Sequence, residues 1–139
     1  MSKKSVNNSS DLNLKIIKEL YEKFKSRDLD RIRELFHQEI EWTQMPSFPN
    51  GGKYIGADAI FENVFKDFSE NWDGWQTNVD DLLEANGTVI ATGYYKGTFK
   101  ATGKSMQAEF AHWYRVVDGK VISFKQYTDT FSVLEATMD

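Results

Sequence analysis

The stretch AEFAHWYRVVDGKVISFKQYTDTF, residues 108–131, decides the fold because it is typical of two long strands joined by one tight turn. Asp118 and Gly119 stand near its middle, and an Asp-Gly pair favours a two-residue hairpin turn, since both central residues need a positive φ. The strands carry a histidine, His112, and a carboxylate, Asp129, among aromatic neighbours. The hairpin therefore raises the question of whether these polar groups point into a pocket.

A two-residue turn also fixes the register of the hairpin. Counting outward from the turn gives four cross-strand pairs: Val117 with Lys120, His112 with Lys125, Phe110 with Tyr127, and Ala108 with Asp129. One face of the predicted hairpin then holds both His112 and Asp129, roughly 13 Å apart along the strand at ~3.3 Å per residue. The opposite face is apolar enough to need a partner, and it carries Trp113, Arg115, Ile122 and Phe124.

The residues before this hairpin predict helices first and strands afterwards. Apolar residues recur at helical spacing in three segments, residues 10–24, 28–36 and 57–71. A short strand over residues 39–44 and a proline- and glycine-rich loop over residues 45–54 separate the second segment from the third. Extended runs joined by turn residues follow from Trp72 onward. This order predicts an α+β fold, in which a curved, cone-shaped antiparallel sheet wraps around three N-terminal helices.

The composition bounds the class of protein. The chain has 139 residues, no cysteine, and a net charge of −4 with a pI near 5.2. We expect one domain over residues 10–139 behind a disordered tail over residues 1–9. The lack of cysteine excludes disulfides and thiolate zinc sites and fits the cytoplasm, and the acidic balance argues against a nucleic-acid partner. No apolar run approaches the ~18 residues of a membrane span, so we expect no membrane partner.

Three segments, taken with the order of the elements, resemble a known group of proteins. They are DLDRIRELFHQEIEW (residues 28–42), YIGADAIFENVF (residues 54–65) and AHWYRVVDGKVISFKQYTDT (residues 111–130). Over residues 11–133 the chain resembles the SnoaL-like proteins of the nuclear transport factor 2-like superfamily, alongside ketosteroid isomerases and limonene epoxide hydrolases. The resemblance implies a cone with a pocket that opens among the helices, and a homodimer formed through the outer face of the sheet.

The resemblance also implies roles for the two polar groups. Aligned on HWYR, His112 takes the place of the protonated Asp that donates to the substrate oxyanion in ketosteroid isomerases. SnoaL-like cyclases use an Asp as acid and base, and the segment YTDT implies that role for Asp129, whose pKa would rise in an apolar cavity. Two alternatives stay open: a core histidine satisfied by a neighbouring polar group, and a strand-end aspartate that caps a turn or faces water.

Several aromatic side chains are candidates to line the same cavity, although each is also consistent with ordinary core packing. They are Tyr21, Trp42, Tyr54, Phe61, Phe65, Phe110 and Tyr127. The chain departs from the isomerase pattern at Met45, which stands before Pro46 where those enzymes carry a catalytic Asp, so we do not expect steroid isomerisation. Two distant histidines and no thiol predict no metal site, and we expect no cofactor.

Three functions remain open at this point. The first is a cofactor-independent enzyme that performs isomerase- or cyclase-type proton transfer on an apolar carbonyl compound, with Asp129 as acid and base and His112 bonded to the carbonyl oxygen. The second is a module that binds a small apolar molecule without chemistry. The third is a dimerisation module whose interior is filled by its own side chains. A hollow of at least ~300 Å³ with polar groups inside separates the first two from the third.

Overall fold

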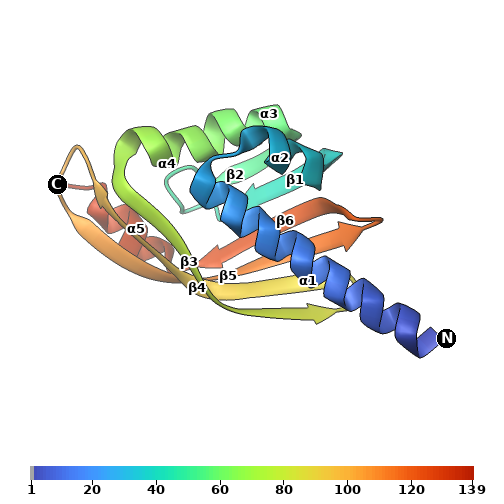
Figure 1. Cartoon of the computed structure of the whole chain (residues 1–139). Coiled ribbons are helices and arrows are strands. Elements are labelled where there is room, and N and C mark those ends of the chain that lie inside the picture. The colour runs from blue at the N-terminus through green and yellow to red at the C-terminus, as the bar shows by residue number, and fades with distance from the viewer. Residues whose placement is uncertain (1) are drawn as a thin grey trace.

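The computed structural model describes residues 2–139, with side chains described from Ser9 onward, so most of the tail predicted over residues 1–9 lies outside the described side chains. In chain order, the elements are α1 (Ser2–Ser26), α2 (Leu29–Leu35), β1 (Phe36–Gln44), β2 (Gly52–Ile55), α3 (Ala57–Ile60), η1 (Phe61–Phe65), α4 (Lys66–Asn71), β3 (Trp72–Ala85), β4 (Thr88–Phe99), β5 (Ser105–Val117), β6 (Lys120–Thr128) and α5 (Thr130–Ala136). In Figure 1, α1 to α4 lie over one side of a long curved sheet, and α5 lies at the end from which the C-terminus emerges.

One sheet of six strands carries the fold, in the order β2-β1-β6-β5-β4-β3. Strands β3 to β6 form the antiparallel meander that the turn residues predict. Strand β1 pairs antiparallel with β2 and parallel with β6, and no tight turn in the sequence announces that parallel pair. The α+β class and the curved sheet around the helices are confirmed, with one parallel pair in an otherwise antiparallel sheet.

The helices supply the apolar wall that faces the sheet. In α1 the buried residues Ile16, Ile17 and Leu20 form one stripe, as the spacing of an amphipathic helix requires. The segment predicted as a third helix, residues 57–71, is helical throughout, as α3, the single π-helical stretch η1 and α4. Its buried residues Ile60 and Val64 face the interior. Helix α1 and the helical segment 57–71 therefore close the interior from the side opposite the strands (Figure 1).

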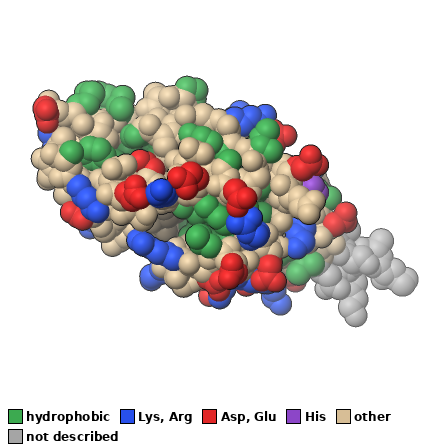
Figure 2. All heavy atoms as spheres, turned by 90° about the horizontal axis from the view of Figure 1, so that it is seen from above, with side chains coloured by type: hydrophobic (Ala, Val, Ile, Leu, Met, Phe, Trp, Pro, Cys, Tyr) green, Lys and Arg blue, Asp and Glu red, His purple; other side chains and the backbone are tan. Residues whose placement is uncertain are grey.

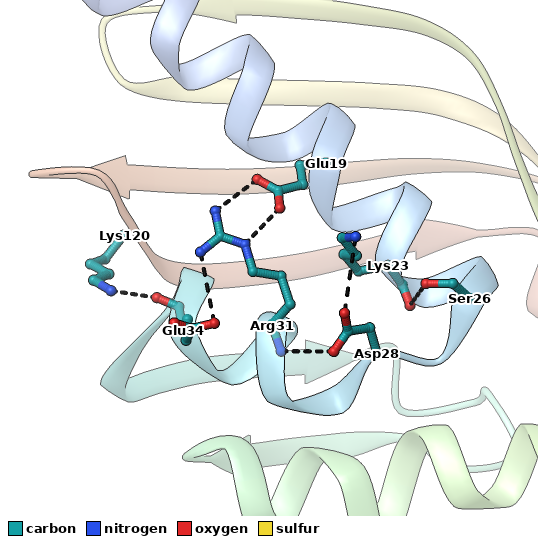
Figure 3. Close-up of polar contacts among 7 residues, drawn as sticks. All are labelled: Glu19, Lys23, Ser26, Asp28, Arg31, Glu34 and Lys120. Atoms are coloured by element: carbon teal, nitrogen blue, oxygen red, sulfur yellow. Dashed lines mark hydrogen bonds and ion pairs between the residues drawn. The ribbon is translucent and has the colours of Figure 1, made fainter.

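A polar cluster holds α2 against α1 (Figure 3). Asp28 caps α2 by accepting a hydrogen bond from the Arg31 backbone N–H at 3.1 Å. The Arg31 guanidinium reaches back to α1 and donates to both carboxylate oxygens of Glu19, at 2.6 and 2.9 Å. These hydrogen bonds lower the pKa of Glu19. Because exposed ion pairs contribute little net stability, the cluster orients the two helices more than it stabilises them.

A β-bulge changes the predicted register of the decisive hairpin. Val117 pairs with Lys120 as predicted, but the register then shifts by one and leaves Ile122 without a cross-strand partner. Every later residue of β6 is consequently paired one position further along than the turn alone implies. His112 therefore lies opposite Gln126.

This shift turns the predicted faces of β6 around, because successive strand side chains point to opposite sides. Phe124, predicted for the outer face, is buried with 2% of its surface exposed. Tyr127, predicted to line the cavity, is 40% exposed and lies beside Trp113 on the outside. The predicted directions of Phe124 and Tyr127 are therefore wrong. Trp113 and Arg115 are exposed on the outer face, as predicted, and Ile122 is half-buried.

The interior divides into two aromatic clusters with His112 between them. One cluster centres on Trp42, which stacks on Phe124 with ring centroids 3.7 Å apart. The other contains Phe48 and Tyr95, whose rings lie 5.9 Å apart. The His112 ring lies 4.8 Å from Phe124 and 5.6 Å from Tyr95, so it contacts both clusters.

The bulge predicts a sharp difference between two phenylalanines of the last third of the chain. We expect Phe124→Ala to lower the free energy of unfolding by about 3–5 kcal/mol, because it removes a buried ring between Trp42 and His112. Phe131→Ala removes a ring that is 67% exposed and should change it by about 0.5 kcal/mol or less. Urea unfolding measures both, and equal losses would contradict the observed register.

Candidate functional site

His112 is a buried polar residue with only 3% of its surface exposed, and both of its ring nitrogens have phenol partners. Tyr21 of α1 places its hydroxyl 2.6 Å from Nδ1. Tyr95 of β4 places its hydroxyl 2.5 Å from Nε2. The imidazole is thus held between a helix and a strand that are far apart in the sequence but meet across the interior.

Further hydrogen bonds extend this arrangement at both ends. The Tyr114 hydroxyl donates to the Tyr21 hydroxyl at 2.8 Å. The Gln126 side-chain amide donates to the Tyr95 hydroxyl at 2.9 Å. We call these five residues, in the order Tyr114, Tyr21, His112, Tyr95 and Gln126, the tyrosine–histidine chain. Among the described residues, no buried side-chain nitrogen or oxygen lacks a hydrogen-bond partner, so burial of this chain is compensated.

Burial keeps the tyrosine–histidine chain uncharged near neutral pH. It lowers the pKa of His112 well below its ordinary value of 6.5, because the charged imidazolium would lose its solvation. Burial also raises the pKa values of Tyr21, Tyr95 and Tyr114 above that of a free phenol. A neutral imidazole has one N–H donor and one acceptor nitrogen, so His112 can pass a hydrogen from one phenol to the other by exchanging tautomers.

Aromatic rings from the sheet and from the helical wall lie around the imidazole. Phe110 stacks on His112 with ring centroids 3.9 Å apart, and Trp42 lies behind Phe124. Phe65 packs edge-on against Trp42 at 5.7 Å, and Phe61 packs beside Phe65 at 5.5 Å. These four candidate residues therefore lie in the same interior as His112, although only Phe110 has its ring stacked directly on the imidazole.

Tyr54 belongs to a second group of polar contacts around the loop that follows β1. Its hydroxyl donates to the Asn50 backbone carbonyl at 2.8 Å. The Asn50 side chain accepts from Gln44 at 3.0 Å and donates to Asp67 of α4 at 3.2 Å. These contacts tie residues 45–51, which we call the 45–51 loop, to the helical wall. Phe48 at the tip of this loop is 3% exposed and packs toward Tyr95.

Asp129 does not lie beside His112. It is the N-cap of α5, where its carboxylate accepts from the Ser132 backbone N–H at 3.1 Å and from the Ser132 hydroxyl at 2.5 Å. Its side chain is exposed, and the hydrogen bonds from Ser132 lower its pKa instead of raising it. The expectation of an inward-facing carboxyl with a raised pKa is therefore wrong, because the bulge in β6 and the start of α5 turn residue 129 outward.

The structure brings together residues that the sequence reasoning did not select. Tyr95 and Gln126 complete the contacts of His112, and Tyr114 supports Tyr21. No signal in the sequence singles out Gln126, because Ile122 and Phe124 alternate as an unbroken strand would. The β-bulge at Ile122 turns Gln126 inward.

Two hollows open on the described surface. One, of about 610 Å³, lies between residues 9–13 of α1 and the turns that follow β3 and β5, beside Glu84 and Gly119. The other, of about 410 Å³, lies between the β1–β2 edge and the beginning of α3, beside His37 and Asp58. Neither hollow is lined by His112, so neither of them is the pocket expected beside it. The His112 ring is instead enclosed by side chains, with Phe110 and Phe124 packed against it.

Charge is mixed over the helical face of the molecule. Figure 2 shows acidic and basic groups interspersed there with apolar side chains between them, and no large area of one sign. Within residues 2–139, no helix combines the length and apolar character needed to cross a bilayer.

Comparison with known proteins places this fold and its interior in context. The model of the SnoaL-like domain matches residues 17–124. An NTF2-like protein from Burkholderia thailandensis is 38% identical, with a TM-score of 0.88 over 91% of this chain and 98% of that one. TerC, co-crystallised with polyporic acid, is 22% identical with a TM-score of 0.80 over 92% and 99% of the two chains. A candidate SnoaL-like polyketide cyclase from a Jannaschia species is 16% identical, with a TM-score of 0.78 over 91% and 92%. Among curated proteins no match was found.

The lowered pKa of His112 predicts how stability depends on pH. The unfolded chain binds a proton at this residue below about pH 6.5 and the folded chain does not, so stability is fully present above that pH and is lost as the pH falls. We expect His112 to contribute a slope of about 1.4 kcal/mol per pH unit between pH 6 and 5. Urea unfolding of His112→Gln should lack this slope, whereas His37→Gln, at an exposed site, should keep it. A slope unchanged in His112→Gln would show that the imidazole is charged in the folded protein.

Proposed function

The chain belongs to the SnoaL-like family, and from this premise we propose that it takes a small apolar carbonyl compound into its interior beside His112. There the tyrosine–histidine chain hydrogen-bonds the carbonyl oxygen and serves proton transfer of the isomerase or cyclase type. The observation that carries the proposal is the neutral imidazole held between two phenols in an otherwise aromatic interior.

This geometry suits the acid half of such chemistry. Tyr95 donates a hydrogen bond to the ligand oxygen, the His112 N–H at Nε2 donates to Tyr95, and Tyr21 donates to Nδ1, so each group keeps its own hydrogen. Water that enters with the ligand accepts the proton that leaves the carbon. The charge that develops on the ligand oxygen is thereby spread along a row of preorganised donors, which is the form of electrostatic stabilisation that contributes most in many enzymes. Among the described residues, no carboxylate contacts this row, so its role is to donate hydrogen.

The aromatic candidates have the corresponding role of holding the ligand. Phe110 already stacks on the imidazole, and Trp42, Phe61 and Phe65 form the wall that a flat ligand would meet. Because these rings fill the space, a ligand enters only by displacing side chains. The 45–51 loop is the element best placed to move, since Phe48 is the part of it that packs toward Tyr95. Tyr54 contacts the same loop through the Asn50 carbonyl.

The relatives support a ligand in this fold without identifying one for this chain. TerC was co-crystallised with polyporic acid, and the Jannaschia protein is a candidate polyketide cyclase, but both are under 25% identical to this chain. They show that the fold is shared. What supports the ligand class here is the donor row and the rings around it.

A second function, binding without chemistry or dimerisation alone, is favoured by two observations. His112 is only 3% exposed and packs against aromatic rings, and Asp129, the carboxylate expected to act as acid and base, faces outward. In this alternative the tyrosine–histidine chain fixes the packing of α1 on the sheet. Ligand binding without turnover would support the carrier, and no binding at all would support the dimerisation module.

The outer face of the sheet is the surface proposed for a homodimer. Trp113 is 46% and Tyr127 is 40% exposed, and their rings pack together beside the Arg115 position of β5. Ile122 extends this face, whereas Phe124 is buried and is removed from it. Grouped exposed aromatic side chains are a feature of interaction surfaces. Sedimentation velocity should show a dimer that Trp113→Lys converts to a monomer, and a wild-type monomer at 100 μM protein would contradict the proposal.

Deuterium exchange tests the proton-transfer function directly. In D₂O, the wild-type protein should accelerate exchange at the carbon next to the carbonyl of 1-indanone, measured by proton NMR. We expect His112→Gln to reduce this acceleration by about 100-fold, because it removes the imidazole that supports Tyr95 as hydrogen donor, and Asp129→Asn to leave it unchanged because residue 129 is an exposed cap.

Circular dichroism is the control for the folding of each variant. Tyr95→Phe gives a second test, at the other end of the hydrogen bond between Tyr95 and His112. Binding of 1-indanone without faster exchange would remove the enzyme and leave the carrier. Exchange that falls in Asp129→Asn but not in His112→Gln would move the chemistry away from the imidazole altogether.

A further inference from the structure

We infer that Gln126 determines whether the buried site donates or accepts hydrogen bonds, because the 45–51 loop holds its amide in one orientation. This inference rests on the proposed function and deepens it. It names a positioning residue outside the ligand contacts, and it links the position of a loop to the kind of ligand atom that the interior recognises.

The orientation of the Gln126 side chain follows from its two partners. Met45 is the first residue of the 45–51 loop, and its backbone N–H donates to Gln126 Oε1 at 3.1 Å. A backbone N–H cannot accept, so the amide oxygen must face the loop. The amide nitrogen then faces Tyr95 and donates to its hydroxyl at 2.9 Å. The assignment of oxygen and nitrogen in this amide is therefore fixed by the main chain.

The loop itself is held where this contact requires it. The Thr128 backbone N–H donates to the Met45 thioether at 3.2 Å, and Phe48 seals the interior beside Tyr95. Gly51 lets the loop close on itself, because a Cβ at that position would lie 2.2 Å from the Met45 carbonyl oxygen. Asn50 fastens the far end to Asp67 at 3.2 Å.

The consequence appears when the hydrogens of the tyrosine–histidine chain are counted. Three phenols and one neutral imidazole bring four hydrogens, and three hydrogen bonds join them: Tyr114 to Tyr21, Tyr21 to His112, and His112 to Tyr95. The fourth bond, from Gln126 to Tyr95, uses an amide hydrogen and consumes none of these four. One phenol hydrogen is therefore surplus in either imidazole tautomer.

A surplus buried hydrogen makes the site a donor. It is best satisfied by a ligand atom that can only accept, such as a carbonyl or enolate oxygen, because an unpaired buried donor is unfavourable. If the loop lifts, the Met45 N–H leaves Gln126, and the amide can turn its oxygen to accept from Tyr95. The tyrosine–histidine chain then has no surplus hydrogen, even without a ligand. Closure of the loop and recognition of an acceptor oxygen are thus two parts of one equilibrium.

Substitution at position 126 separates this role from simple packing. In Gln126→Glu, an ionised carboxylate accepts from both Met45 N–H and the Tyr95 hydroxyl, which consumes the surplus hydrogen. A protonated carboxyl donates to Tyr95 as the native amide does, which restores it. In Gln126→Leu, residue 126 cannot accept from Tyr95, so the surplus hydrogen remains. If residue 126 only filled space, the ligand preference would change in the same way in both variants.

Few other titratable groups face position 126. Tyr95 of β4 and His112 of β5 are its titratable neighbours across the sheet, and Tyr21 of α1 and Tyr114 of β5 lie beyond them. Asp67 of α4 hydrogen-bonds Asn50 of the 45–51 loop and not Gln126. The phenols and the imidazole stay neutral near pH 7, so a pH-dependent change in Gln126→Glu reports the new carboxyl group.

The experiment compares 1-indanone with indane, which has the same ring frame but no oxygen, by isothermal calorimetry or fluorescence quenching between pH 5 and 9. We expect the wild-type protein and Gln126→Leu to bind 1-indanone about fivefold more tightly than indane throughout this range, the effect of one net hydrogen bond. In Gln126→Glu the preference should hold at low pH and disappear as the carboxyl ionises.

Each outcome has a separate meaning. If neither compound binds the wild-type protein, the proposed function fails. If both bind equally well, the ligand site stands but the surplus hydrogen is refuted. If Gln126→Glu keeps its preference at every pH, or Gln126→Leu loses it, the role of the Gln126 amide is refuted. Because the wild-type measurement needs no variant, the inference stays testable even if a substituted chain fails to fold.

Discussion

The structure depends on one constraint: every nitrogen and oxygen of a polar row buried in an aromatic interior needs a hydrogen-bond partner. His112 is enclosed by Phe110, Phe124 and Tyr95, where an unpaired imidazole would be strongly unfavourable. Its pairing requires a phenol from α1 on one side and a phenol from β4 on the other. The pairing therefore specifies how the first helix lies on the sheet, and it makes the interior a place where hydrogen can be moved between neutral groups.

The order of elements was predictable from the sequence because it follows from local signals, such as turn residues and helical spacing. Asn86-Gly87 and Asp118-Gly119 both form the tight turns that they predict, with positive φ at all four residues. The parallel pairing of β1 with β6 could not be predicted in this way, since it joins segments about 80 residues apart without a turn between them. Strand β2 and α5 were missed for related reasons. Strand β2 is only four residues long. Helix α5 is capped by Asp129, a residue that the alternating pattern assigns to the preceding strand.

The candidate site was predictable only in part. The alternation along β5 correctly turned Phe110 and His112 inward. Tyr127 and Asp129 were assigned to the same face because a hairpin count assumes an unbroken ladder, and the bulge at Ile122 breaks it. A bulge is one added residue, and its position is decided by how the side chains on both sides pack. The network that results, with Gln126 between the 45–51 loop and Tyr95, exists only in three dimensions.

The central claim concerns the positions of hydrogen atoms, so neutron diffraction from a deuterated crystal at neutral pH tests it most directly. The account predicts one deuterium on the His112 ring, the Gln126 amide nitrogen facing Tyr95, and one phenol deuterium of the row that bonds to no other member of it. A doubly deuterated imidazole, or a Gln126 oxygen that accepts from Tyr95, would contradict the account.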